Sequence, residues 1–274
     1  GLAGITRARQ VLAGREPAPE ATHALAGHIA DLSLGVIVHS QAARRALGAV
    51  TRTPVVYIPL GFAVPPAVTI EPPGLLANLP PDTRILASFG FISPTKRLDV
   101  VLRTLTGLRD RLPPFRYVLV GEPVAGYDAQ ALAETVGLGD VVLSTGHVDP
   151  PTFARFLAHT DVGIALRTGP TGGEMSAALL HMMAYGQPVV VSDVGAFAEL
   201  PAGVVWKIAQ DGDEDEQLGA ALRRLLAEPE LRRQMGERAR RHVQENHAFD
   251  LVAGRILAFV QACSTVTAVV SSSA

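Results

Sequence analysis

The sequence predicts an α/β protein built on a Rossmann-like, doubly wound parallel sheet. Short apolar runs rich in valine and isoleucine alternate with segments of helical periodicity from residue 84 to residue 208. Several of these runs lack the polar–apolar alternation of a half-exposed strand, which indicates strands that are covered on both faces. The composition supports the same class, because a chain with 48% hydrophobic and 18% charged residues can bury a large core.

Eight segments have the pattern of strands, each a short β-branched run bounded by glycine, proline or polar residues. They span residues 35–40, 55–61, 84–91, 117–122, 141–148, 161–167, 188–193 and 203–208. Helices are expected at 96–112, 126–137, 150–159, 174–185, 214–227, 229–245 and 249–262. The repeated order of strand and helix predicts parallel strands that are joined by crossover helices.

A proline-rich stretch divides the chain. Residues 63–83 hold six prolines and no helical period, so we interpret them as a linker. The expected organisation is a partial N-terminal domain, a linker, a Rossmann-like domain, a C-terminal helix and a frayed polar tail. These parts span residues 1–62, 63–83, 84–246, 247–263 and 264–274.

Charge and cysteine content exclude several function classes. The formal net charge of -2 provides no whole-chain attraction to nucleic acid, and the lone Cys263 excludes an internal disulfide framework or a cysteine-built metal site. We expect a cytoplasmic protein, because no apolar run reaches the length of a membrane span or a secretory leader. The basic side of residues 231–242 allows peripheral contact with the inner surface of an anionic membrane.

The loop after the strand at 84–91 carries a glycine and two cations. Gly90 ends the strand, and Lys96 and Arg97 open the next helix. In open α/β sheets ligands bind at the carboxyl ends of the strands, where cations and a close backbone suit a diphosphate. The alternative is that both cations are merely solvated, since basic residues are common on surfaces.

A second polar loop follows the strand at 141–148. Gly146 and His147 lie near its end, where they suit contact with a base or a ribose. The alternative is an ordinary polar loop, because a lone histidine after a strand has no special role in most proteins.

The third loop precedes the helix expected at 174–185. Thr171, Gly172 and Gly173 lead into Glu174, and the first N–H groups of a helix form a natural anion site. The alternative is a capping box made by Thr171 and Glu174. His181 follows Glu174 by seven residues and therefore shares its helix face, where it suits a ribose or else packs in the core.

Other motifs that carry chemistry are missing from the sequence. No segment has the spacing of a P-loop, a zinc site or a G-x-S-x-G elbow, and the glycines do not form G-x-G-x-x-G after the first strand. We therefore expect neither a metal ion nor a nicotinamide cofactor.

Taken in order, the three loops give a more specific signal. They resemble the carboxy-terminal, nucleotide-sugar-binding domain of GT-B glycosyltransferases of the group 1 type, family 4 of the retaining enzymes. That family has G-R-x-x-x-x-K-G, then T-G-x-V, then E-x7-E followed by A-x-G-x-P-V-V-x-S-D-x-G. The sequence matches through Gly90 and Lys96, through residues 145–148 and through residues 174–199, and the resemblance covers most of residues 34–262.

The departures from the family pattern concern charged positions. Phe91 stands where the family has arginine, Arg97 stands where it has glycine, and His181 occupies the position of the second glutamate. Glu174 lies one residue from the first glutamate. The loop is instead similar to a G-E-x-S variant, which favours phosphate binding by the backbone at 172–176 and includes Gly173, Glu174, Met175 and Ser176.

The resemblance implies a retaining transfer of sugar from a UDP-, GDP- or ADP-sugar, without a metal ion, to a glycan, a lipid-linked sugar or a small molecule. Lys96 and Glu174 would be catalytic, the lysine by stabilising the leaving diphosphate and the glutamate by positioning the sugar. Residues 1–62 would be the remnant of the acceptor-side domain, so we expect a fragment of a longer protein. Two alternatives stay open, a noncatalytic module that needs a partner chain and a GT-B nucleotide-sugar epimerase.

Overall fold

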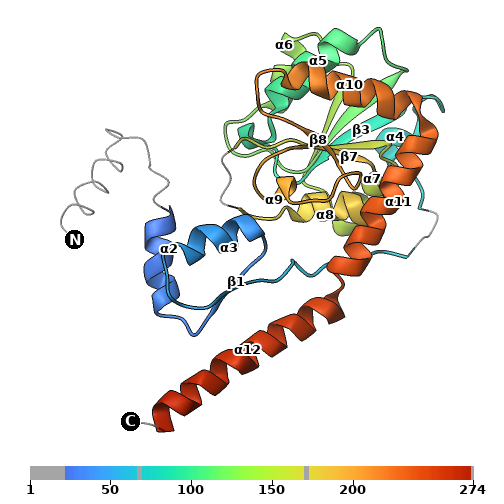
Figure 1. The fold of residues 1–274 in the computed structure, drawn as a ribbon. Coiled ribbons are helices and arrows are strands. Elements are labelled where there is room, and N and C mark those ends of the chain that lie inside the picture. Colours follow the sequence, from blue (N-terminus) through green and yellow to red (C-terminus); the bar gives the residue numbers. More distant parts are fainter. Residues whose placement is uncertain (1–21, 67–69, 170–172, 273–274) are drawn as a thin grey trace, which may run out of the picture. The chain divides into compact units, whose positions relative to one another are not determined.

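The computed structural model describes residues 22–66, 70–169 and 173–272. The chain divides into two compact units, drawn in Figure 1. One unit consists of Gly1–Pro59 with Ala253–Ala274, and the other of Leu60–Val252. The division between Pro59 and Leu60 lies close to the expected start of the linker at residue 63.

The smaller unit contains a strand–helix–strand element. Strands β1 (Val36–Val38) and β2 (Val55–Tyr57) pair in parallel, and α3 (Gln41–Gly48) connects them. Helix α2 (Thr22–Asp31) precedes β1. Ser40 begins α3 as its N-cap, because its side chain accepts a hydrogen bond from the N–H of Ala43. Residues 1–21, the start of the expected acceptor-side remnant, lie outside the described residues.

The larger unit is built on a six-stranded parallel sheet, which confirms the predicted fold class. Its strands lie in the order β5-β4-β3-β6-β7-β8. Their bounds are β3 (Arg84–Phe89), β4 (Phe115–Val120), β5 (Val142–Gly146), β6 (Val162–Ala165), β7 (Val189–Ser192) and β8 (Trp206–Ile208). The chain first winds outward from β3 to β5 and then returns to place β6 on the other side of β3. The loops after β3 and β6 therefore part in opposite directions, which is where α/β sheets bind ligands.

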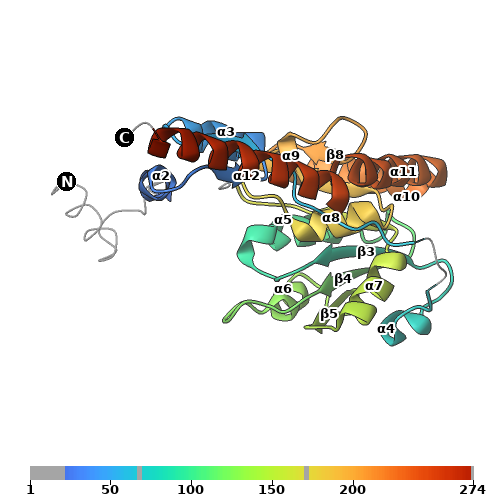
Figure 2. The same ribbon diagram turned by 90° about the horizontal axis from the view of Figure 1, so that it is seen from below.

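Helices cover both faces of this sheet, as Figures 1 and 2 show. One layer contains α5 (Leu98–Leu108), α6 (Ala129–Thr135) and α10 (Glu214–Ala227). The opposite layer contains α4 (Gly74–Ala77), α7 (Pro150–Ala158), α8 (Ala177–Ala184) and α11 (Pro229–Asn246). The short helices η1 (Pro94–Lys96) and α9 (Gly195–Ala198) follow β3 and β7, and α12 (Phe249–Ser272) ends the described chain.

The core follows the two-residue period of the strands. On β3, Leu86 packs with the α5 layer, whereas its neighbours Ile85 and Ala87 pack with the α8 layer. Five of the six β3 residues are buried, which accounts for the continuous apolar run in the sequence. The polar exception is Ser88, whose hydroxyl lies 2.8 Å from the Tyr117 hydroxyl and 2.6 Å from the Ile164 carbonyl oxygen.

Several element boundaries differ from the sequence expectation, and three of the differences have a clear local cause or consequence. The helix expected from residue 96 begins at Leu98, because Arg97 has a left-handed backbone with φ of 54°. The stretch expected as linker contains the short helix α4, which buries Leu76. Helix α12 continues to Ser272 rather than ending at 262, in a run from residue 255 without glycine or proline.

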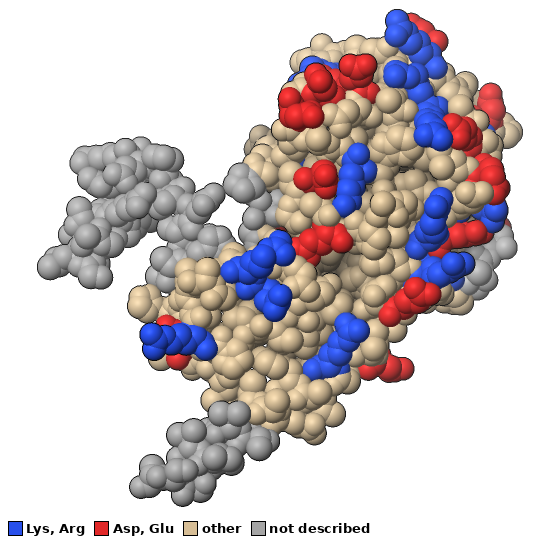
Figure 3. Space-filling view, in the orientation of Figure 1, with Lys and Arg blue, Asp and Glu red and all other residues tan. Residues whose placement is uncertain are grey.

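The surface of the larger unit carries both signs of charge, and Figure 3 shows acidic and basic side chains interspersed on the displayed face. On α11, Arg233 pairs with Glu230 and Glu237, so part of the basic stretch at 231–242 is neutralised by its own helix. None of the described helices combines the length and the apolar character that a bilayer crossing requires.

Two histidines lie at the end of α11. The His242 and His247 rings are 5.7 Å apart, and burial lowers the pKa of both. His247 also lies 2.8 Å from the Leu60 carbonyl oxygen through its Nδ1. Both rings are therefore held preferentially in the neutral form.

Candidate donor-binding site

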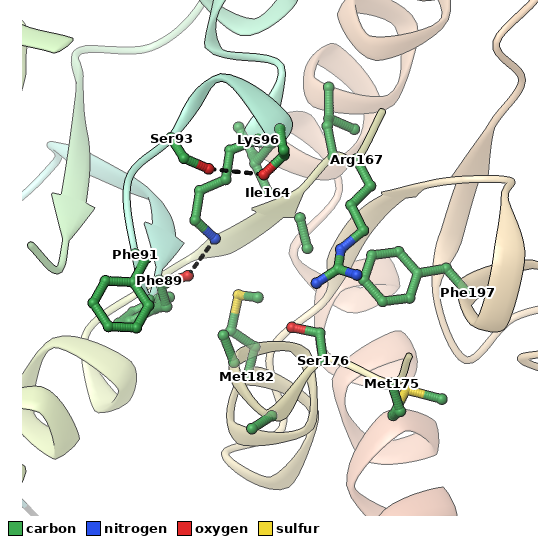
Figure 4. Close-up of a pocket in the computed structure, with 16 residues that line it drawn as sticks. Phe89, Phe91, Ser93, Lys96, Ile164, Arg167, Met175, Ser176, Met182 and Phe197 are labelled. Atoms are coloured by element: carbon green, nitrogen blue, oxygen red, sulfur yellow. Dashed lines mark hydrogen bonds between the residues drawn. The ribbon is translucent and has the colours of Figure 1, made fainter. Parts of the chain in front are cut away.

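A cavity of about 370 Å³ lies at the carboxyl edge of the sheet, at the switch point between β3 and β6. Figure 4 shows the side chains that surround it. Its lining comes from the end of β3 and the loop to η1, from the end of β6, from the start of α8 and from α9. The residues are Phe89, Gly90, Phe91, Ser93, Thr95, Lys96, Ile164, Ala165, Leu166, Arg167, Met175, Ser176, Ala177, Ala178, Met182 and Phe197.

Lys96 is the cation that the first polar loop brings into the cavity. Its ammonium group donates a hydrogen bond of 2.6 Å to the Phe89 carbonyl oxygen, at the end of β3 (Figure 4). Burial, and secondarily the charge of Arg167, lower the pKa of Lys96 to about 8. Gly90 turns the chain with φ of 86°, a backbone conformation that favours glycine. The loop thus presents a partly desolvated positive charge to the cavity.

Arg97 lies outside the lining of the cavity. Its guanidinium forms a forked ion pair with Glu214 of α10, with N–O distances of 2.5 and 3.1 Å. Both side chains are largely buried, at 22% and 10% exposure. Arg97 was a donor-binding candidate in the sequence, and the structure instead uses it to join α10 to the start of α5.

The third polar loop reaches the cavity through the start of α8. Ser176 is the N-cap of this helix, and its hydroxyl accepts a hydrogen bond of 3.3 Å from the N–H of Leu179. The helix therefore begins three residues later than expected, and Glu174 lies before it. The capping box with Glu174 at its third position is absent for this reason. Met175 and Ser176 line the cavity, and their expected role in donor binding stays a prediction.

The glycines of this loop are only partly described. Gly173 has φ of 84°, a conformation that favours glycine, and it precedes the cavity lining. Thr171 and Gly172 lie outside the described residues, so their expected binding roles remain predictions.

Arg167 is a lining residue that the sequence analysis missed. It follows β6 and was included in an expected strand, so its side chain was not considered separately. The structure places its guanidinium 5.2 Å from the centre of the Phe197 ring and in an ion pair with Glu174. The available signal was its position, because a polar residue at the carboxyl end of a central parallel strand faces the ligand edge.

The second polar loop lies away from the cavity. Gly146 has φ of 64° and ends β5, and His147 follows it as an exposed residue. Strand β5 is at one edge of the sheet and is separated from β3 by β4. Neither residue lines the cavity, so a role in binding a base or a ribose would require a ligand that extends beyond it.

His181 lies in an aromatic cluster and is not part of the cavity lining. Its ring makes edge-on contacts with Phe62 and Phe153, with ring centres 4.6 and 5.2 Å away. Burial lowers the pKa of the imidazole. This packing corresponds to the core alternative rather than to ribose binding. The expected shared helix face with Glu174 is absent, because α8 begins after Glu174.

Within the described residues, no group of three or more His, Cys, Asp or Glu side chains is placed to hold a metal ion. The cavity instead combines Lys96 and Arg167 with the first turn of α8. Two cations and a helix N-terminus suit a ligand that carries more than one negative charge.

Comparisons with solved structures agree with this fold. HepE from Anabaena, in complex with UDP, matches with a TM-score of 0.72 and 18% identity over 90% of this chain and 69% of that one. Sucrose-phosphate synthase from Thermosynechococcus elongatus matches with a TM-score of 0.74 and 21% identity, over 91% of this chain and 63% of that one. Both likenesses extend over most of the chain and establish the GT-B type of architecture.

Two proteins with similar sequences carry the name of a glycosyltransferase. The D-inositol 3-phosphate glycosyltransferase of Streptomyces griseus is 31% identical over 61% of this chain and 37% of that protein. The enzyme of the same name from Thermobispora bispora is 29% identical over 68% of this chain and 48% of that protein. This chain thus spans less than half the length of these two relatives.

The family model described as "Glycosyl transferases group 1" matches residues 77–242. This match covers more than half of the chain and includes β3 to β8, Lys96, Arg167 and the start of α8. The chain therefore belongs to the group 1 glycosyltransferase family.

Proposed function

We propose that the Leu60–Val252 unit is the donor-binding portion of a retaining glycosyltransferase, which transfers a sugar from a nucleotide-diphospho-sugar without a metal ion. The observation that carries the proposal is the cavity at the β3–β6 switch point, where Lys96 and the start of α8 meet. In this reaction the nucleoside diphosphate leaves as an anion. A site that stabilises the developing negative charge accelerates such a step.

Lys96 supplies the first part of this stabilisation. With a pKa of about 8 its ammonium group is mostly protonated at neutral pH, and it lies in a partly desolvated position. A charge-assisted hydrogen bond to a phosphate oxygen would be stronger there than on the open surface. An anion would also replace the Phe89 carbonyl oxygen as the better acceptor for the lysine nitrogen.

The first turn of α8 supplies the second part. The first N–H groups of a helix lack acceptors within the helix, and the helix dipole places partial positive charge there. Ser176 caps one of these groups, that of Leu179, while Ala177 and Ala178 line the cavity. The remaining N–H groups are suited to the second phosphate. Glu174, just before this turn, is placed to accept hydrogen bonds from donor-sugar hydroxyls.

The relatives suggest which ligands to test first. HepE was solved with UDP, and two relatives act, by name, on D-inositol 3-phosphate. UDP is therefore the first nucleotide to test and a polyol phosphate the first acceptor. GDP and ADP remain candidates for the donor nucleotide.

Isothermal titration calorimetry of the folded chain with UDP, GDP and ADP tests the proposal, with the matching nucleosides as controls. We expect at least one of the three diphosphates to bind. Lys96→Ala should weaken the binding of that diphosphate much more than it weakens the binding of the matching nucleoside. Equal weakening of both would contradict a phosphate role for Lys96. If a folded chain binds none of the three diphosphates, the proposed function is wrong. Release of sugar from the bound nucleotide sugar would separate an enzyme from a noncatalytic module.

A further inference from the structure

Arg167 is held in place by its own backbone. Its N–H donates a hydrogen bond of 3.0 Å to the Ser192 hydroxyl at the end of β7. Its carbonyl oxygen accepts a hydrogen bond from the side-chain amide of Gln210, in the segment after β8. The position of the Arg167 backbone is thus set by the neighbouring strand β7 and by the segment that follows β8. Its side chain extends from that anchored backbone into the cavity lining.

The guanidinium of Arg167 and the ammonium of Lys96 border the same space. Figure 4 shows the two groups on different sides of the cavity, with the Ser176 side chain below the guanidinium. In the part of the chain that the structure describes, these are the Lys and Arg residues of the cavity lining. The charge of Arg167 also contributes to the lowered pKa of Lys96, so the two cations repel each other across the site.

The anion that Arg167 now contacts is a weak partner. Glu174 forms the ion pair from the segment before α8, and its side chain is 57% exposed, whereas that of Arg167 is 26% exposed. An ion pair this exposed contributes little to stability, because water and salt screen it. Among the described residues, the guanidinium also lies over the face of the Phe197 ring, a contact that uses none of its N–H groups.

We infer that Arg167 is the second diphosphate-binding cation of the site, and that Glu174 is a placeholder which the diphosphate displaces. This inference rests on the proposed function and adds the residue and the exchange to it. A diphosphate carries at least two charges and offers a planar pair of oxygens that matches the guanidinium fork. It would bridge Arg167 and Lys96 and remove their repulsion. The displaced carboxylate would then be available to the donor sugar.

A double-mutant cycle tests the exchange, with inorganic pyrophosphate and the tightest-binding of UDP, GDP and ADP as ligands. Pyrophosphate reports on the cations alone, since it has no base or ribose. We expect Arg167→Gln to lower the affinity for both ligands by about 10- to 100-fold, which is the range for the loss of a charge-assisted hydrogen bond. Glu174→Gln should tighten binding, because it removes the competing carboxylate. In the Arg167→Gln background, Glu174→Gln should have no effect.

Controls separate this inference from simpler explanations. Arg109→Gln removes an exposed arginine that pairs with Asp140 away from the cavity, and it should leave both affinities unchanged. Thermal unfolding checks that each variant is folded. Arg167→Lys keeps the charge without the fork, so it should lose less affinity than folded Arg167→Gln. If Arg167→Gln does not fold, folded Arg167→Lys should still bind more weakly than the wild type.

Two results would overturn the assignment while leaving the proposed function intact. The first is that folded Arg167→Gln binds the diphosphate with wild-type affinity, whereas Lys96→Met binds it more weakly than the wild type. The other is a gain from Glu174→Gln that persists in the Arg167→Gln background, since this would indicate general repulsion rather than a displaced ion pair. If the wild-type chain binds none of the nucleoside diphosphates, the proposed function itself is refuted, and the assignment with it.

Discussion

The lowered pKa of Lys96 predicts an unusual pH dependence of diphosphate binding. Only the protonated ammonium attracts a phosphate, and the pKa of Lys96 in the free chain is about 8. About 90% of the chains therefore carry the charge at pH 7 and about 10% at pH 9. If the bound anion raises the pKa of Lys96 well above this range, the affinity should fall by about tenfold between these two pH values.

The same linkage predicts that binding takes up protons. Near pH 8, Lys96 is neutral in about half of the molecules, so the binding of one diphosphate should take up about half a proton. Calorimetric titration in buffers of different ionisation enthalpy measures this number directly. Lys96→Met is the matched control, because methionine is an uncharged side chain of similar length. It should bind more weakly at pH 7, by about 10- to 100-fold, and should take up no proton at this residue.

The wild type and the variant should converge as the pH rises. Above about pH 9 the wild-type lysine is mostly neutral, so its advantage over Lys96→Met should shrink. Comparison of the two proteins also cancels any titration of the ligand. A constant ratio of their affinities between pH 7 and 9.5, with no difference in proton uptake, would refute the assignment of Lys96 to the diphosphate.

Packing and charge elsewhere in the larger unit lead to four more expected outcomes. Gly236→Ala should lower the unfolding free energy in urea by about 1–3 kcal/mol, because its Cβ would lie 1.8 Å from the Gly186 carbonyl oxygen. Gly107→Ala, in open space on α5, should instead raise it by about 0.5–1 kcal/mol. Arg97→Gln should lower it by about 3 kcal/mol by leaving Glu214 unpaired, and a loss of nucleotide affinity without a loss of stability would contradict this. The three histidines whose pKa burial lowers bind protons more readily in the unfolded chain, so stability should decrease as the pH falls below about 6.5, and a flat profile down to pH 5 would count against it.

Much of the site could be predicted from local sequence. Gly90 and Lys96 follow an apolar run with the pattern of a buried strand, and ligand sites gather at the ends of such strands. Met175 and Ser176 belong to the stretch that resembles a G-E-x-S loop, and both line the cavity. These positions depend on backbone direction and on residues nearby in the chain, which sequence patterns record well.

Partners distant in sequence account for the differences. Arg97 is separated by 117 residues from Glu214, the carboxylate that removes it from the site. His181 is packed by Phe62 and Phe153, which come from separate segments. Arg167 was not predicted as a cavity residue, because the residues around it in the sequence have the pattern of an ordinary strand.

By itself, therefore, the sequence determined the alternation of strands and helices, the parallel sheet and the polar loops that contribute to its ligand edge. Hydrophobic periodicity and glycine or capping positions are local properties, and they suffice for this level of description. Only the tertiary structure decided which cations line the cavity, Lys96 and Arg167 rather than Arg97. The physical reason is that the direction of a long charged side chain depends on the counter-charge it meets, and that partner is supplied by the fold.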